Sequence, residues 1–303
     1  MRLSCGFLLI AMSLLGQAPP KDESAGDSKI FEYNADTAFD FREGTMKTRE
    51  GVTVYDASFI SPKGGRVPCY VVAPVRKGKY AGIVWQHGGG QNRQWFLPDA
   101  LELARSGGAV SILLDAPFER SADMLGPQSQ DEARRAYDQL LQVAVDVRRA
   151  IDVLAVRPDV DPERIGYVGL SFGAMMGASL AGVETRFKTY VLDVGMEGFV
   201  RHYRESPVMA GMRASLGPQR MERMLAAVGP LDNIHYIAKA TAPMLFQAAR
   251  YDLGVPEQHT YDFFAAAGSP QKELRWYDSG HNLNDPQAYA DRVAWLKKYL
   301  KIK

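Results

Sequence analysis

The chain has 303 residues, of which 46% are hydrophobic and 23% are charged, and its 36 basic and 35 acidic side chains give a formal net charge of +1. These proportions are ordinary for a globular protein with a full hydrophobic core. A balanced charge without a long basic run argues against nucleic acid or an anionic membrane surface as the main partner.

The first residues, 1–18, have the layout of a secretory signal peptide. Arg2 precedes an apolar run, and small residues lead to an expected cleavage site after Ala18. The apolar run is shorter than the roughly 20 residues that a bilayer span needs, and Cys5 stands before most of it, where a lipoprotein cysteine would follow it. We therefore expect an exported protein, periplasmic or secreted, without a stable membrane anchor.

Residues 19–30 are polar and lack periodicity, which predicts a flexible linker ahead of an ordered domain over residues 31–303. That domain begins with two strand candidates, 52–60 and 67–74, joined by a turn that contains proline and two glycines, which predicts a hairpin. Cys69 lies in the second of these strands. We interpret it as a small buried side chain rather than a reactive thiol.

Beyond the hairpin, apolar runs alternate with helical patterns. Uninterrupted apolar strands separated by amphipathic helices predict a mostly parallel sheet with helices on both faces. The expected strands are 81–87, 109–117, 164–171, 188–195, 242–249 and 272–279, and the expected helices are 98–107, 133–154, 172–182, 256–268 and 286–300.

One segment interrupts this alternation. Residues 196–231 stand between two strands that a single crossover helix could join, so we predict a short cap insertion there. The segment is rich in methionine, which suits an adaptable wall facing a substrate but is equally typical of core filling, and both readings stay open.

A serine flanked by glycines marks the end of the strand 164–171. Gly169, Ser171 and Gly173 fit the G-x-S-x-G pattern, in which a sharp turn between strand and helix raises the serine hydroxyl above the sheet. Glycine is needed on both sides because the neighbouring backbone passes very close. The pattern predicts a nucleophile at Ser171 rather than a simple glycine-rich helix cap.

A serine nucleophile needs a base, normally a histidine that a carboxylate holds in place. His281 follows the last predicted strand, and Asp252 follows the strand before it, which gives the chain order serine, aspartate, histidine. Asp193 is the alternative acid, since it ends a strand nearer the serine. Asp278 lies too close to the histidine along the same loop, and Asp115 is expected at the rim.

The remaining histidines are given other roles. We expect His87 to shape the glycine loop that follows it, and we read His202, His235 and His259 as solvated or structural. The glycine loop is the expected source of one oxyanion donor, from Gly89 or Gly90, and the backbone of Phe172 is the expected second donor.

Four stretches carry a family resemblance: "HGGG", "GYVGLSFGAMMG", "APMLFQAARYDLGVP" and "SGHNLND". Together they resemble the α/β-hydrolase superfamily, near its dienelactone hydrolase-like and prolyl-oligopeptidase-like branches, over about residues 50–301. The resemblance implies an α/β-hydrolase fold with an eight-stranded sheet and a Ser-Asp-His triad, here Ser171, Asp252 and His281. Dienelactone hydrolases proper have cysteine as the nucleophile, whereas this chain has serine.

These residues predict a serine esterase that cleaves small-molecule carboxylic esters through an acyl-enzyme, with no cofactor and no metal. Two alternatives stay open. One is a serine peptidase of the prolyl-oligopeptidase type that lacks the propeller, and the other is a hydrolase fold that binds ligands without catalysis.

Overall fold

The computed structural model describes residues 26–303. The predicted signal peptide and most of the predicted linker lie outside the described residues. The end of that linker is described, and Ser28–Phe31 form the 3-10 helix η1, in which Phe31 is fully buried. No helix within residues 26–303 has both the length and the apolar composition that a membrane span requires.

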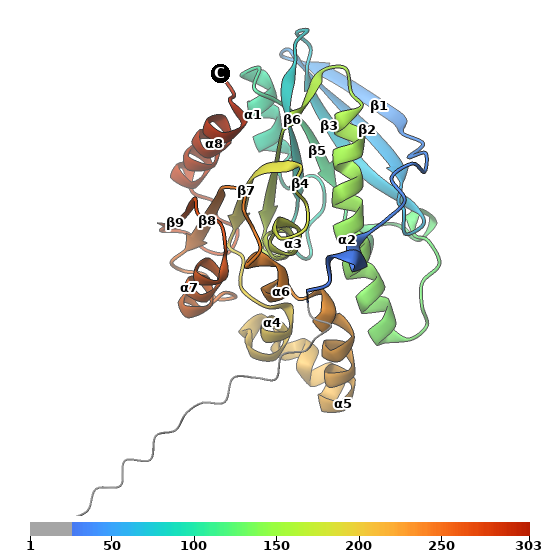
Figure 1. The fold of residues 1–303 in the computed structure, drawn as a ribbon, viewed down its shortest axis with the longest axis vertical. Helices are drawn as coiled ribbons and strands as arrows, with labels where there is room; N and C mark the ends of the chain where they lie inside the picture. Colours follow the sequence, from blue (N-terminus) through green and yellow to red (C-terminus); the bar gives the residue numbers. More distant parts are fainter. Residues whose placement is uncertain (1–25) are drawn as a thin grey trace, which may run out of the picture.

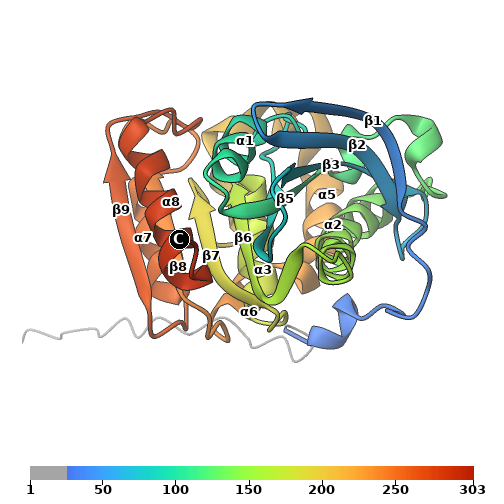
Figure 2. The ribbon, with the colours of Figure 1, turned by 90° about the horizontal axis from the view of Figure 1, so that it is seen from above.

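Within residues 26–303, nine strands form one sheet in the order β1-β2-β3-β5-β4-β6-β7-β8-β9, with β1 and β9 at opposite edges (Figure 2). Strands β4 to β9 are parallel, whereas β1, β2, β3 and β5 pair antiparallel in that order. The strands are β1 (Arg42–Arg49), β2 (Val52–Ile60), β3 (Arg66–Pro74), β4 (Tyr80–Gln86), β5 (Ala109–Leu114), β6 (Val160–Leu170), β7 (Phe187–Asp193), β8 (Met244–Ala249) and β9 (Lys272–Tyr277).

The mostly parallel sheet confirms the predicted fold class, but the predicted number of eight strands is wrong. The additional strand is β1, whose residues are all exposed. A strand without a buried face has no alternation of apolar and polar residues, so the pattern that revealed the other strands is missing there.

Helices cover both faces of the sheet, as predicted. Two separate hydrophobic clusters show which helices share a face: one joins the sheet to α1 and α8, and the other joins it to α2, α3, α6 and α7. The helices are α1 (Leu97–Arg105), α2 (Glu132–Ala155), α3 (Phe172–Ala181), α6 (Ile234–Ile237), α7 (Glu257–Ala266) and α8 (Pro286–Leu300). Short 3-10 turns, η2 (Pro117–Glu119) and η3 (Ala122–Met124), follow β5.

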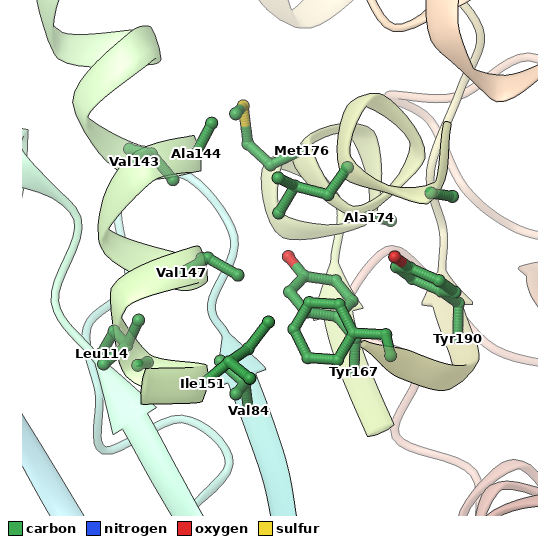
Figure 3. Packing of buried hydrophobic residues seen from close by; sticks show 14 of the residues in the cluster. Val84, Leu114, Val143, Ala144, Val147, Ile151, Tyr167, Ala174, Met176 and Tyr190 are labelled. Carbon is green, nitrogen blue, oxygen red and sulfur yellow. The ribbon is translucent and has the colours of Figure 1, made fainter. Parts of the chain in front are cut away.

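The long helix α2 packs on the central strands through one apolar stripe. Its residues Val147 and Ile151 face Val84 of β4 and Tyr167 of β6 (Figure 3), and all four side chains are completely buried. Apolar side chains recur along this helix at three- and four-residue spacing because they are buried against the sheet, as the sequence indicated.

The predicted insertion forms a cap of two helices, α4 (Phe199–Glu205) and α5 (Ala210–Val228), with the 3-10 turns η4 (Pro207–Met209) and η5 (Gly229–Leu231). Both helices lie beyond one end of the sheet (Figure 1). Gly217 has a positive φ of 71° and precedes Pro218, so α5 is two helical pieces joined at a kink. The cap thus stands over the edge at which parallel strands β6, β7 and β8 end.

Candidate active site

Ser171 stands at the turn between β6 and α3, with φ of 51° and ψ of −110°, a strained conformation for a residue with a side chain. The neighbouring glycines are required by space. A Cβ atom on Gly169 would lie 2.4 Å from the carbonyl of Gly173, and one on Gly173 would lie 2.2 Å from the carbonyl oxygen of Gln86. The G-x-S-x-G spacing therefore has the steric basis that the sequence predicted.

The structure brings Ser171, His281 and Asp252 together from loops that follow three different strands. His281 Nε2 lies 2.8 Å from Ser171 Oγ, and His281 Nδ1 lies 2.7 Å from Asp252 Oδ2. Ser171 and Asp252 are 81 residues apart in the chain, and Asp252 and His281 are 29 residues apart, so only the fold brings the three side chains into contact. The imidazole can accept the serine proton through one nitrogen while the carboxylate fixes the other.

Backbone groups hold the carboxylate of Asp252 in position. Its Oδ1 accepts hydrogen bonds from the N–H groups of Gly254 at 2.8 Å and Val255 at 3.0 Å, while its side chain is only 2% exposed. One oxygen is thus tied to the loop and the other is directed to His281. The carboxylate cannot turn away from the imidazole without losing these bonds.

Asp193, the alternative acid, is occupied elsewhere. Its fully buried carboxylate contacts Arg292 of α8, and burial acts to raise the pKa of Asp193 while the guanidinium opposes that shift. Its backbone carbonyl accepts a hydrogen bond from the Ser171 N–H at 2.7 Å. Asp193 therefore supports the serine turn through its main chain and anchors α8 through its side chain.

The other two aspartates also lie outside the contact with His281. Asp115 accepts a hydrogen bond from the Arg93 N–H at 2.7 Å, in the open hollow beside β2 and β3. Asp278 forms an exposed ion pair with Arg250 at 3.1 Å.

Backbone amides next to Ser171 are available to an oxyanion. Phe172 opens α3, so its N–H has no acceptor inside the helix, and among residues 26–303 neither it nor Gly89 donates to another backbone carbonyl. Both residues line the cavity at Ser171, as does Gly90. Burial raises the pKa of Glu119, and a backbone hydrogen bond from Gly90 opposes that rise. The Gly89 amide is therefore the more available of the two loop donors.

His87 shapes the glycine loop. Its Nδ1 donates to the Gly88 carbonyl at 2.7 Å, and its Nε2 accepts from the Ala116 N–H at 3.0 Å. Both ring nitrogens are thus engaged in the neutral imidazole, and burial lowers the pKa of His87, which keeps it neutral.

A cavity of about 600 Å³ opens at Ser171 and His281. The cap forms much of its wall, which answers the question left open about the methionine-rich segment. Met209, Met212 and Met224 line the cavity, whereas Met221 packs with Leu225 in a small cluster of the cap. The segment serves both purposes.

His202, read from the sequence as solvated or structural, lies in the cavity wall on α4. Its Nδ1 is 2.8 Å from the Met196 sulfur. The sequence carries no signal for this placement, because the position depends on how the cap folds back over the sheet.

Residues 130–303 match the model of the prolyl oligopeptidase family, more than half of the chain. The chain belongs to this family. It is a serine hydrolase of the α/β-hydrolase superfamily. The sequence resembled two branches of that superfamily, and the match is to the prolyl-oligopeptidase branch.

The chain is similar to a curated relative, dipeptidyl-peptidase 5 from Porphyromonas gingivalis. The two sequences are 26% identical over 255 residues. The alignment covers 78% of this chain but only 36% of the relative, so the chain spans about a third of that protein's length.

Solved structures of both esterases and peptidases share the fold. An acetyl xylan esterase from Paenibacillus sp. R4 superimposes with a TM-score of 0.73 at 18% identity, covering 90% of this chain and 92% of the esterase. A prolyl endopeptidase structure gives a TM-score of 0.66 at 19% identity, covering 85% of this chain and 40% of the peptidase. At these identities the likeness establishes the fold alone.

Proposed function

We propose that the protein hydrolyses carboxylic esters through an acyl-enzyme intermediate, with Ser171 as nucleophile, His281 as general base and Asp252 as the group that orients the base. The observation that carries this proposal is the continuous hydrogen-bonded series from Asp252 Oδ2 through both imidazole nitrogens to Ser171 Oγ. No other histidine among the described residues contacts a serine hydroxyl in this way.

In the proposed reaction, Ser171 Oγ attacks the ester carbonyl carbon while His281 Nε2 takes the serine proton. The carbonyl oxygen becomes an oxyanion, to which the amides of Phe172 and Gly89 donate hydrogen bonds. Collapse of this intermediate breaks the bond to the alcohol, which leaves with the proton from His281. Water then attacks the acyl-enzyme with the same base, and the acid and free Ser171 are released.

The wall of the cavity supports an ester substrate over a dipeptidyl one. A peptide bound by its amino terminus brings an ammonium group into the site, and burying that charge without a partner is costly. Of the described residues that line the cavity, none is aspartate or glutamate. An uncharged ester needs no such partner.

Peptide hydrolysis is the second candidate. It is favoured by the family to which the chain belongs and by the curated relative, which is named as a dipeptidyl-peptidase. The same Ser171, His281 and Asp252 would serve an amide, so the two candidates differ only in what the cavity accepts.

The test compares the wild type with Ser171→Ala on p-nitrophenyl butyrate and on a panel of peptide p-nitroanilides. We expect the wild type to cleave the ester, and we expect the variant to lose about 10⁴-fold or more in kcat while keeping the circular dichroism spectrum and thermal midpoint of the wild type. A fluorophosphonate probe should add to Ser171 of the wild type, as read by peptide mass spectrometry.

Cleavage of the anilides with no turnover of esters would replace the esterase proposal with the peptidase one. A wild type that neither turns over a substrate nor reacts with the probe would indicate a hydrolase fold used for binding.

A further inference from the structure

The cavity at Ser171 has walls that carry no formal charge. Among the described residues that line it there is no aspartate, glutamate, lysine or arginine, and most of the side chains are aliphatic, aromatic or methionine. Phe172 stands between two other rings, with its centroid 5.1 Å from that of Phe118 and 6.2 Å from that of Phe199. An apolar surface of this kind favours an apolar ligand.

Besides Ser171 and His281, three polar side chains line the wall, and none of them carries a charge. Burial lowers the pKa of His202 to about 4, and burial raises the pKa of Tyr203, so both side chains are uncharged at neutral pH. Gln139, the third polar group, donates its amide to Gln128. A charged ligand would therefore find no compensating charge in the wall.

The cavity is lined by His281 on one side of Ser171 and reaches α2 on the other. Its floor includes Ala136 and Leu140 of α2, and α2 packs against β4 and β6. His281 follows β9, which is an edge strand, whereas β4 and β6 are central strands, and Figure 1 shows α2 and β9 on opposite sides of α3. The alcohol must leave beside His281, because this imidazole returns the proton, so the space toward α2 is left for the acyl group.

The apolar wall is continuous from this floor to the protein surface. Phe118, Val208 and Met212 line the cavity and are also exposed, by 41%, 58% and 41%. Large exposed apolar side chains beside an apolar cavity mark a place of entry for an apolar group. Methionine side chains in the wall can adjust to acyl groups of different length.

We propose that this cavity is an acyl pocket and that the preferred substrates are neutral esters of medium-chain aliphatic acids, longer than acetate. The inference rests on the proposed ester hydrolysis. Because each buried methylene contributes about fourfold in affinity, chain length should raise kcat/KM until the cavity is filled.

The first experiment measures kcat/KM of the wild type for p-nitrophenyl acetate, butyrate, hexanoate and octanoate. We expect kcat/KM to increase along the series, with at least about a tenfold advantage of hexanoate or octanoate over acetate. A flat profile, or a preference for acetate, would overturn the acyl-pocket proposal while leaving ester hydrolysis intact.

The second experiment fills the floor of the cavity. Ala136→Phe should lower the ratio of octanoate to acetate kcat/KM by about tenfold, because the larger ring occupies the far part of the pocket. Ala133→Phe, the same substitution one helical turn earlier on α2 and outside the cavity, should leave both values unchanged. An unchanged ratio in Ala136→Phe would contradict the proposed location of the acyl chain.

A binding measurement separates this inference from the proposed function. Saturation-transfer NMR of the Ser171→Ala variant should show contact with the alkyl chain of methyl octanoate and little with methyl acetate. Binding of methyl octanoate together with a wild type that hydrolyses no ester would keep the pocket and remove the esterase function. Ester turnover by the wild type, without binding of methyl octanoate to the variant, would keep the esterase function and contradict the acyl pocket.

Discussion

Asp193 ends β7, and Asp252 lies in the loop that follows the neighbouring strand β8; their side chains have different neighbours. Asp252 contacts His281, whereas Asp193 contacts Arg292. We predict that Asp252→Asn lowers kcat by about 10⁴-fold, because the imidazole loses the acceptor that fixes its tautomer, with little change in the free energy of unfolding. Ester assays and urea unfolding would measure the two quantities.

Asp193→Asn is the matched control for that prediction. It leaves the Arg292 guanidinium without its buried partner, so the free energy of unfolding should fall by about 3 to 5 kcal/mol. Loss of turnover without loss of stability in Asp193→Asn, with normal turnover in Asp252→Asn, would reverse the assignment.

His202 makes stability depend on pH. Burial, followed by the positive charges of nearby side chains, lowers the pKa of His202 to about 4, below its ordinary value near 6.5. The unfolded chain therefore binds a proton before the folded protein does as the pH falls. The contribution of neutral His202 to the free energy of unfolding is complete above about pH 6.5 and is progressively lost between about pH 6.5 and 4.

The test compares the wild type with His202→Gln in urea at pH 7.5 and pH 5. We expect the wild type to lose more stability than the variant on acidification, by roughly 1 to 2 kcal/mol. Equal losses would show that His202 titrates at its ordinary pKa in the folded protein.

The sequence could single out candidates in a motif of fixed spacing and in the loops that follow predicted strands. Ser171 could be found because crowding at the turn demands glycine at 169 and 173, and that demand is visible as a motif. His202 could not be found in the same way, since its place in the cavity wall depends on distant contacts rather than on a local rule. The same holds for the choice between Gly89 and Gly90.

At the scale of elements, one buried hydrogen bond ties the cap to the loop that carries Asp252. Ser206, at the junction of α4 and η4, is fully buried and donates to the Gly254 carbonyl at 2.8 Å. Ser206→Ala should lower the free energy of unfolding by about 1 to 3 kcal/mol, because the carbonyl is left buried without a donor. Limited proteolysis should cut the cap faster in this variant.

Ser215→Ala is the control, since Ser215 lies exposed on α5 of the same cap. It should change neither the unfolding free energy nor the rate of cleavage. Equal behaviour of the two variants would show that the bond from Ser206 does not anchor the cap.

Elements with a buried face could be predicted from the sequence, and elements without one could not. The apolar stripe of α2 and the uninterrupted apolar residues of β4 reflect burial on one or both sides. β1 has no buried residue, and the kinked helix α5 has only a short buried stretch near its end. The cap could be located as an interruption, but its shape follows from packing that no local pattern records.

At the scale of the whole molecule, Arg292 joins two helices on one face of the sheet to the end of a central strand. It extends from α8 to Asp193 of β7 and to Asp99 of α1, the latter at 3.0 Å, and its side chain is only 8% exposed. Arg292→Ala would leave a buried carboxylate unpaired. We predict a loss of about 3 to 5 kcal/mol in the free energy of unfolding, measured by urea denaturation.

Arg275→Ala provides the comparison. Arg275 also pairs with two carboxylates, Glu273 and Asp291, but its side chain is 37% exposed. Solvent screens such pairs, so this variant should lose less than about 1 kcal/mol. Similar losses in both variants would argue against a special role for the buried pair.

The proposed triad and much of the cavity wall come from separate parts of the chain, and this separation has an evolutionary consequence. Ser171, His281 and Asp252, the proposed nucleophile, base and orienting acid, stand on loops of the sheet, whereas α4 and α5 form much of the cavity wall and belong to one continuous insertion between β7 and α6. Exchange of that single segment between related enzymes could therefore redirect selectivity while the reaction itself is inherited unchanged.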